Sequence, residues 1–177
     1  MSGFPTAAAF RIVGGMTNAA PLELHRDTVR PEWIDYNGHM NVAYYLLAFD
    51  HATDAVFDHF GIGKSYVEAE SRSLFVVEAH LTYAREVTAG DPLRFASRIL
   101  RVDDKRLHLF HEMFHGEDGF LAATAEFMLV HVDLADRRSA PFPDAIRAAL
   151  DAAAAAHAAL PRPPQAGRAV GALRPSV

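Results

Sequence analysis

The sequence WIDYNGHMN occupies residues 33–41, directly before the longest helical pattern of the chain. Its Asp35, Asn37 and Gly38 favour a tight turn, because short Asp and Asn side chains bond to nearby backbone N–H groups and glycine accepts positive φ angles. The Asn-Gly pair marks the point where the chain reverses. We therefore expect residues 33–41 to form a turn that leads into a helix.

That helix is predicted from Asn41, which has the character of an N-cap residue, to about Phe60. Apolar residues recur along it at helical spacing, namely Val42, Tyr45, Leu46, Phe49, Ala52, Val56, Phe57 and Phe60. The opposite face carries Asp50, Asp54 and Asp58. Because the first two turns, 42–49, carry no charge, we expect the start of the helix to be buried.

Alternating apolar and polar residues predict strands on both sides of this helix. One is expected before it, at 22–30, and four follow a linking piece at 64–72: residues 73–86, 93–102, 106–114 and 121–134. In the first of these four, one face is expected to carry Phe75, Val77, Ala79, Leu81 and Tyr83. Turn residues between the long strands indicate an antiparallel meander. An alanine-rich helix at 143–160 completes the order.

These elements predict an α+β fold in which an antiparallel sheet curls around a long central helix. A single sheet leaves the far side of that helix and one edge strand uncovered, so we expect a homodimer. A chain of 177 residues suits one domain. We place it at 21–160, between a flexible N-terminal arm at 1–20 and a disordered tail at 161–177 that contains proline and arginine.

Composition excludes several classes of protein. Without cysteine the chain has no disulfide, thiolate metal site, iron–sulfur cluster or cysteine nucleophile. All 22 acidic residues lie between 22 and 160 and the formal net charge is −5, so neither nucleic acid nor an anionic membrane is an expected partner. No run reaches the roughly 18 apolar residues of a membrane-spanning helix. The apolar stretch at 7–10 lacks a basic segment before it, and we expect a cytoplasmic protein.

The WIDYNGHMN segment, with the helix and four strands that follow it, resembles the hotdog-fold thioesterases related to 4-hydroxybenzoyl-CoA thioesterase. In that family an Asp stands three residues before a Gly at the start of the central helix, as Asp35 and Gly38 do here. A large branch also has the Gly-His-x-Asn form of Gly38, His39 and Asn41. Trp33 stands where many relatives have a second Asp, which leaves Asp35 as the carboxylate of this loop.

The resemblance covers roughly residues 22–140. Within it, residues 31–54, 73–93 and 104–115 look like the betainyl-CoA thioesterases of carnitine degradation, some of which are fused to L-carnitine dehydrogenase. The resemblance implies a hotdog fold, a homodimer or homotetramer, and an enzyme that hydrolyses a small acyl-CoA, with betainyl-CoA split to betaine and coenzyme A.

The implied catalytic group is Asp35, acting as general base or nucleophile on the thioester. Backbone N–H groups at the start of the helix can polarise the carbonyl, and Gly38 allows the thioester to approach the backbone. A structural alternative stays open for each residue. Asp35 can cap its own turn, Asn41 can serve as N-cap as well as substrate contact, and His39 can simply orient the loop.

For a trimethylammonium group, aromatic faces and a carboxylate are the fitting partners, and the candidates are Trp33, Tyr36, Tyr44 and Glu78. Core packing of the aromatic residues and an outward-facing Glu78 are the alternatives. Candidates for the coenzyme A phosphates are Arg85, Lys105, Arg106 and Arg137, with Arg138 beside them. No cofactor and no metal are expected, since His108, His111 and His115 form no recognised ligand motif.

Two other functions remain compatible with the sequence. The chain could hydrolyse another aliphatic or aromatic acyl-CoA or an acyl-carrier substrate. It could also be a non-catalytic hotdog module that binds acyl-CoA. A carboxylate at Asp35 favours an enzyme, because a binding module needs the pocket but not the acid.

Overall fold

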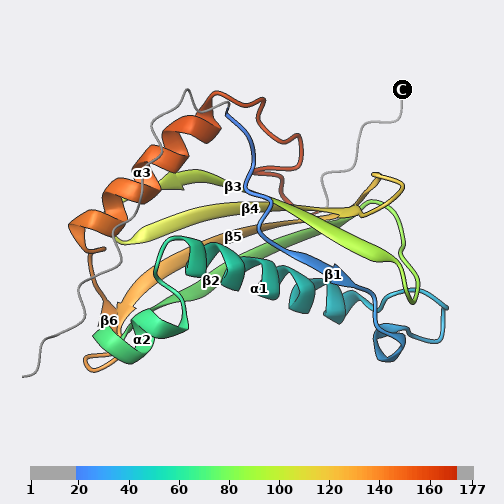
Figure 1. Ribbon diagram of the computed structural model, residues 1–177, viewed down its shortest axis with the longest axis horizontal. Coiled ribbons are helices and arrows are strands. Elements are labelled where there is room, and N and C mark those ends of the chain that lie inside the picture. The colour runs from blue at the N-terminus through green and yellow to red at the C-terminus, as the bar shows by residue number, and fades with distance from the viewer. Residues whose placement is uncertain (1–18, 171–177) are drawn as a thin grey trace, which may run out of the picture.

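The computed structural model describes residues 19–170, which form one antiparallel sheet with helices packed against it (Figure 1). In chain order the elements are β1 (Arg26–Thr28), the 3₁₀ turn η1 (Pro31–Trp33), α1 (Val42–His59), α2 (Lys64–Glu70), β2 (Arg72–Tyr83), β3 (Pro92–Val102), β4 (Arg106–His115), β5 (Leu121–Asp133), β6 (Arg138–Ser139) and α3 (Asp144–Ala158). The predicted α+β fold, a curled antiparallel sheet around a long helix, is confirmed. None of the helices in the described part is long and apolar enough to cross a membrane.

The strands run in the order β1-β3-β4-β5-β2, and β6 pairs with β5. The predicted meander is confirmed for β3, β4 and β5 but is wrong for β2, which pairs with β5 at the far edge. The connection from β2 to β3 crosses the end of the sheet, where the backbone of Ala84 bonds to Ala122, that of Val87 to Met40 and that of Asp91 to Val29. Alternation predicts a strand but not its neighbours, which explains the error.

Helix α1 lies along one face of the sheet and carries the centre of the core (Figure 1). Its predicted N-cap is confirmed, because Asn41 Oδ1 accepts a hydrogen bond from the Ala43 N–H at 3.0 Å. Phe49 is fully buried and meets Phe95 of β3 edge to face. The expectation that the first two turns are buried on all sides is wrong, since one side exposes Val42, Leu46 and Leu47.

Strand β2 departs from regular alternation. Its register against β5 shifts between Val76 and Glu78, so a bulge at Val77 reverses which face later residues occupy. Ala79, Leu81 and Tyr83 share a face, opposite buried or half-buried residues of β5, whereas Phe75 shares the other face with Glu78. The single predicted apolar face is therefore wrong, and this edge strand exposes Phe75, Val76 and Val77.

Other boundaries also differ from expectation. The linking piece at 64–72 contains α2, a helix too short to show a clear apolar period, and β1 is shorter than the predicted 22–30. The alanine-rich helix is confirmed as α3, which packs against β3. Residues 161–170, expected to begin a disordered tail, instead contact the sheet: Arg98 donates to the Pro161 carbonyl and the Gly167 N–H to Glu126. The rest of that tail and residues 1–18 lie outside the described residues.

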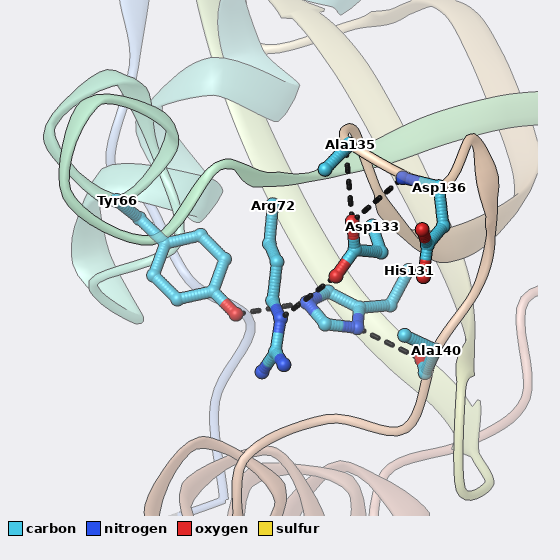
Figure 2. A network of polar contacts seen from close by, with 7 residues as sticks. All are labelled: Tyr66, Arg72, His131, Asp133, Ala135, Asp136 and Ala140. Carbon is cyan, nitrogen blue, oxygen red and sulfur yellow. Dashed lines mark hydrogen bonds and ion pairs between the residues drawn. The ribbon is translucent and has the colours of Figure 1, made fainter.

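A polar network joins α2 to β5 and to the segment after β6 (Figure 2). The buried His131 lies between the Tyr66 hydroxyl, 2.9 Å from Nε2, and the Ala140 carbonyl, 2.8 Å from Nδ1. Since a carbonyl only accepts, Nδ1 carries the proton and Tyr66 donates to Nε2. Arg72 pairs with Asp133, whose carboxylate also accepts from the N–H groups of Ala135 and Asp136. Burial lowers the pKa of His131, which keeps the ring neutral.

Candidate active site

The loop before α1 is held by its own backbone. The Asp35 N–H donates to the His39 carbonyl at 3.1 Å, and the Gly38 N–H donates to the Asp35 carbonyl at 3.0 Å. Gly38 has a φ of 84°, a conformation that other residues adopt at a cost. The loop is also fixed to its surroundings, since the Asn41 N–H donates to Trp33 and the Met40 N–H to Val87. The predicted turn at residues 33–41 is therefore confirmed.

The Asp35 carboxylate has two unequal partners. Oδ1 accepts the Asn37 N–H at 2.8 Å, which is the turn-capping interaction that the sequence allowed. Oδ2 lies 3.4 Å from Asn41 Nδ2, a long and weak contact. One oxygen therefore orients the carboxylate, while the other keeps lone pairs for a water or a substrate.

Asn41 connects this carboxylate to the helix. Its Oδ1 caps the Ala43 N–H, and its amide nitrogen faces Asp35. The capping role and a position beside the candidate catalytic group thus coexist in one side chain. The helix begins at Val42, so the positive end of its dipole lies close to Asp35.

A cleft of about 440 Å³ opens beside Asp35. The Asp35 loop, the start of α1 and the segment after β2 line it with Asp35, Asn37, His39, Met40, Val42, Tyr45, Tyr83, Ala84, Arg85 and Glu86. The rings of Tyr45 and Tyr83 meet edge to face at 5.1 Å. Burial raises the pKa of both phenols, so both stay protonated at neutral pH. The cleft combines aromatic surface with a carboxylate and a helix start, which suits a small acyl group.

The four residues predicted to surround the acyl group are not gathered at this cleft within the chain. Trp33 is 2% exposed and stacks on Tyr44 at 5.7 Å, which makes both part of the core packing. Tyr36 is 97% exposed. Glu78 lies on β2 beside a separate cavity that includes His108 and Glu126. The turn at 33–41 places Trp33 and Tyr36 in different surroundings although they are close in sequence. The bulge in β2 sets the face on which Glu78 lies.

The four basic candidates for coenzyme A are also divided. Arg85 lines the Asp35 cleft, with its guanidinium 3.9 Å from the centre of the Phe120 ring. At the opposite end of the sheet, Lys105 and Arg137 lie in turns and Arg106 begins β4. There, burial tends to raise the pKa of Asp103, but N–H donors from Lys105 and Arg106 and the Arg106 guanidinium outweigh it and lower that pKa to about 2. Of these four candidates, Arg85 alone lines the Asp35 cleft.

Sequence reasoning missed a larger cavity of about 630 Å³ between α1, α2 and β2. Its lining includes Asp50, Asp54 and Asp58, together with Phe57 and Phe75. Burial raises the pKa of Asp54, and the neighbouring Asp50 and Asp58 add to that effect. The four-residue spacing of these acids was visible in the sequence, but their position beside the exposed edge of β2 was not.

Sequence reasoning also missed a buried polar cluster under α1. His111 Nδ1 lies 2.8 Å from Ser97 Oγ, and Nε2 lies 3.1 Å from Thr53 Oγ1, which donates to the Phe49 carbonyl. The Thr53 hydroxyl proton is therefore committed to Phe49, so His111 carries its proton on Nε2 and accepts from Ser97. Burial lowers the pKa of His111 to about 3. This neutral, satisfied group is structural.

Comparisons with known proteins agree with this geometry. The sequence matches the family model of the thioesterase-like superfamily over residues 29–150. It is 42% identical over 150 residues to a betainyl-CoA thioesterase of Pseudomonas aeruginosa, covering 85% of this chain and 94% of that protein.

A longer relative and a solved structure are also similar to this chain. An L-carnitine dehydrogenase/betainyl-CoA thioesterase of Agrobacterium fabrum is 42% identical over 154 residues, which are 87% of this chain and 31% of that protein. A hypothetical protein of Staphylococcus aureus, solved in complex with CoA, superimposes with a TM-score of 0.78 at 31% identity, covering 85% of this chain and 96% of that one. The chain therefore belongs to the thioesterase-like superfamily.

Proposed function

We propose that this protein hydrolyses betainyl-CoA to betaine and coenzyme A, with Asp35 as the catalytic carboxylate. Family membership assigns it to the thioester hydrolases. The choice of acyl group rests on the betainyl-CoA thioesterases among its relatives. The observation that carries the catalytic role is the Asp35 carboxylate on the wall of the cleft, which the Asn37 N–H orients through Oδ1 while Oδ2 has only the weak contact with Asn41.

The reaction follows from the groups around this oxygen. Asp35 Oδ2 takes a proton from water as the water oxygen bonds to the thioester carbonyl carbon. The resulting oxyanion is stabilised by the N-terminal end of α1. Collapse of the intermediate breaks the C–S bond, and the coenzyme A sulfur receives the proton from Asp35. In the nucleophilic variant, Oδ2 bonds to the carbonyl carbon and expels the coenzyme A thiolate, and water then opens the anhydride, which releases betaine and restores the Asp35 carboxylate while the proton from water goes to the thiolate.

Within one chain, the groups on the Asp35 cleft that suit the trimethylammonium group differ from the predicted four. Tyr45, Tyr83 and Glu86 line the Asp35 cleft and supply two aromatic rings and a carboxylate. Aromatic faces stabilise such a cation by roughly 0.5–2 kcal/mol. Arg85, on the same cleft, is the proposed contact for the coenzyme A phosphates. Lys105, Arg106 and Arg137 could join them only from a second subunit.

The proposed assembly is a homodimer, with a homotetramer as the alternative, in the cytoplasm where acyl-CoA substrates are available. A second copy would cover the exposed apolar residues of α1 and of the β2 edge. Val42 belongs both to this exposed side and to the Asp35 cleft, so a partner would also close one wall of the cleft.

Release of free thiol from a panel of acyl-CoAs tests the catalytic role. We expect Asp35→Asn to lower kcat by about 100-fold or more, because the amide cannot take the proton. Asn can still accept the Asn37 N–H, so circular dichroism should show an unchanged fold. Near-normal turnover by this variant would remove Asp35 from the mechanism.

The same assay tests the acyl group. Betainyl-CoA should exceed its neutral isostere, 3,3-dimethylbutanoyl-CoA, in kcat/KM. Glu86→Gln should reduce this preference about fivefold, equivalent to about 1 kcal/mol. Glu70→Gln, a matched change on the exposed surface of α2, should leave it unchanged. Equal hydrolysis of both esters by the unmodified protein would refute betaine as the acyl group but not thioester hydrolysis. Binding of every ester without hydrolysis would instead indicate the non-catalytic module.

A further inference from the structure

Three side chains from separate parts of the sequence converge between β1 and α1. Asp27 Oδ2 lies 3.8 Å from His25 Nε2 and 3.5 Å from His51 Nδ1. The three ligand atoms all lie within 4.8 Å of one another. His25 and Asp27 are two residues apart in an extended segment and so share a face, while His51 approaches from the helix.

The side chains of this cluster are held in place by their surroundings. Asp27 Oδ1 accepts the Thr28 N–H at 2.8 Å, which turns Oδ2 toward the two imidazoles. The His25 carbonyl accepts the Phe95 N–H at 3.2 Å, and its ring packs on the Phe95 ring at 5.1 Å. Phe95 of β3 therefore holds both the backbone and the ring of His25 in place.

His25 Nε2 is a buried atom that lacks a hydrogen-bond partner within the described residues. A buried polar atom without a partner is costly, and native structures contain few of them. The Asp27 carboxylate and the His51 ring nitrogen lie within 4.8 Å of the His25 ligand atom, too far for a hydrogen bond in the case of Asp27 at 3.8 Å. A ligand between the three side chains would satisfy this nitrogen.

The donor set and spacing fit a transition-metal ion. Two imidazoles and a carboxylate are common zinc ligands, with bonds of about 2.0–2.2 Å. Tetrahedral geometry then places ligand atoms about 3.3 Å apart. The distances from Asp27 Oδ2 to the two histidine nitrogens, 3.8 Å and 3.5 Å, therefore need to shorten only slightly for these atoms to bind one ion. The side chains of His25, Asp27 and His51 are 23%, 15% and 33% exposed, which leaves access for the ion and for a water at the fourth position.

We propose that His25, Asp27 and His51 bind one Zn²⁺ ion, which ties β1 to α1. The site is independent of the thioester chemistry, because none of the three residues lines the Asp35 cleft. The expectation of no metal was based on His108, His111 and His115. It could not find this site, since His51 lies far along the sequence from the other two ligands and no short motif connects them.

Titration of the untagged protein with Co²⁺, a spectroscopic substitute for Zn²⁺, tests the site. We expect visible d–d absorption that saturates at one ion per chain and is displaced by Zn²⁺. His51→Asn should abolish it, as should Asp27→Asn. His59→Asn, a matched change of an exposed histidine on the same helix, should keep it.

Thermal unfolding gives a second readout that needs neither substrate nor Co²⁺. At about a hundred times its Kd, Zn²⁺ should raise the Tm of the wild-type protein by about 5 °C or more, and His51→Asn should remove this shift. Absence of both the absorption and the Tm shift would refute the site and leave three ion-paired side chains. Signals that persist in both ligand variants would likewise refute it.

Discussion

His111 is fully buried between the sheet and α1, and its two ring nitrogens are satisfied by Ser97 and Thr53. Burial lowers its pKa to about 3 in the folded protein, against about 6.5 in an unfolded chain. The unfolded state therefore binds the proton more readily, and the contribution of this residue to stability is complete above pH 6.5. It is lost progressively as the pH falls from 6.5 toward 3.

The loss of stability at low pH that His111 causes can be measured. Between pH 7 and pH 5 the single histidine should reduce the free energy of unfolding by about 2 kcal/mol. His111→Gln should unfold at lower urea at pH 7 but should lose about 2 kcal/mol less than wild type between these pH values. Ala79→Ser, at an exposed position of β2, is a suitable control, since it removes no titrating group. Equal pH slopes for wild type and His111→Gln would contradict the assignment.

At the scale of elements, α2 is anchored by one hydrogen bond that sequence could not suggest. Tyr66 donates to His131 Nε2, and His131 donates to Ala140, so α2, β5 and the segment after β6 are joined through one ring (Figure 2). Tyr66→Phe keeps the ring but leaves the buried nitrogen without its donor. We expect a loss of about 1–2 kcal/mol in the free energy of unfolding, measured in urea. Tyr36→Phe, at an exposed position, should change it by less than about 0.5 kcal/mol.

The elements that the sequence could predict are those that local chemistry determines. The turn at 33–41, the Asn41 cap and the long strands depend on local chemistry, so they were predictable. The partner of β2 depends on the path of residues 84–91 across the end of the sheet, and the direction of Glu78 depends on a bulge at Val77. Neither leaves a local signal. Asp35 was predictable as a candidate because its loop has a distinctive sequence, whereas Tyr45, Tyr83 and Glu86 meet only after folding.

At the scale of the whole molecule, the main feature is an apolar surface that a single chain leaves exposed to solvent. Val42, Leu46 and Leu47 of α1 and Phe75, Val76 and Val77 of β2 are all exposed, and β2 is an edge of the sheet that the described residues form. An uncovered apolar edge strand promotes association between chains. A two-fold axis beside β2 would pair this strand with its copy and cover both helices at once.

Val77→Asp tests this assembly at its most exposed apolar position on the edge, where the side chain is 60% exposed. A two-fold interface contains the substitution twice, so a cost of about 2 kcal/mol per copy would weaken the dimer about a thousandfold. Light scattering at micromolar concentration should give twice 19.4 kDa for wild type and 19.4 kDa for Val77→Asp. Ala148→Asp, on the exposed side of α3, should remain dimeric. If the dimer closes the Asp35 cleft, Val77→Asp should also lose thioesterase activity in proportion to its monomer fraction. A wild-type protein of 19.4 kDa would show instead that the apolar edge is left open and that one chain carries the whole site.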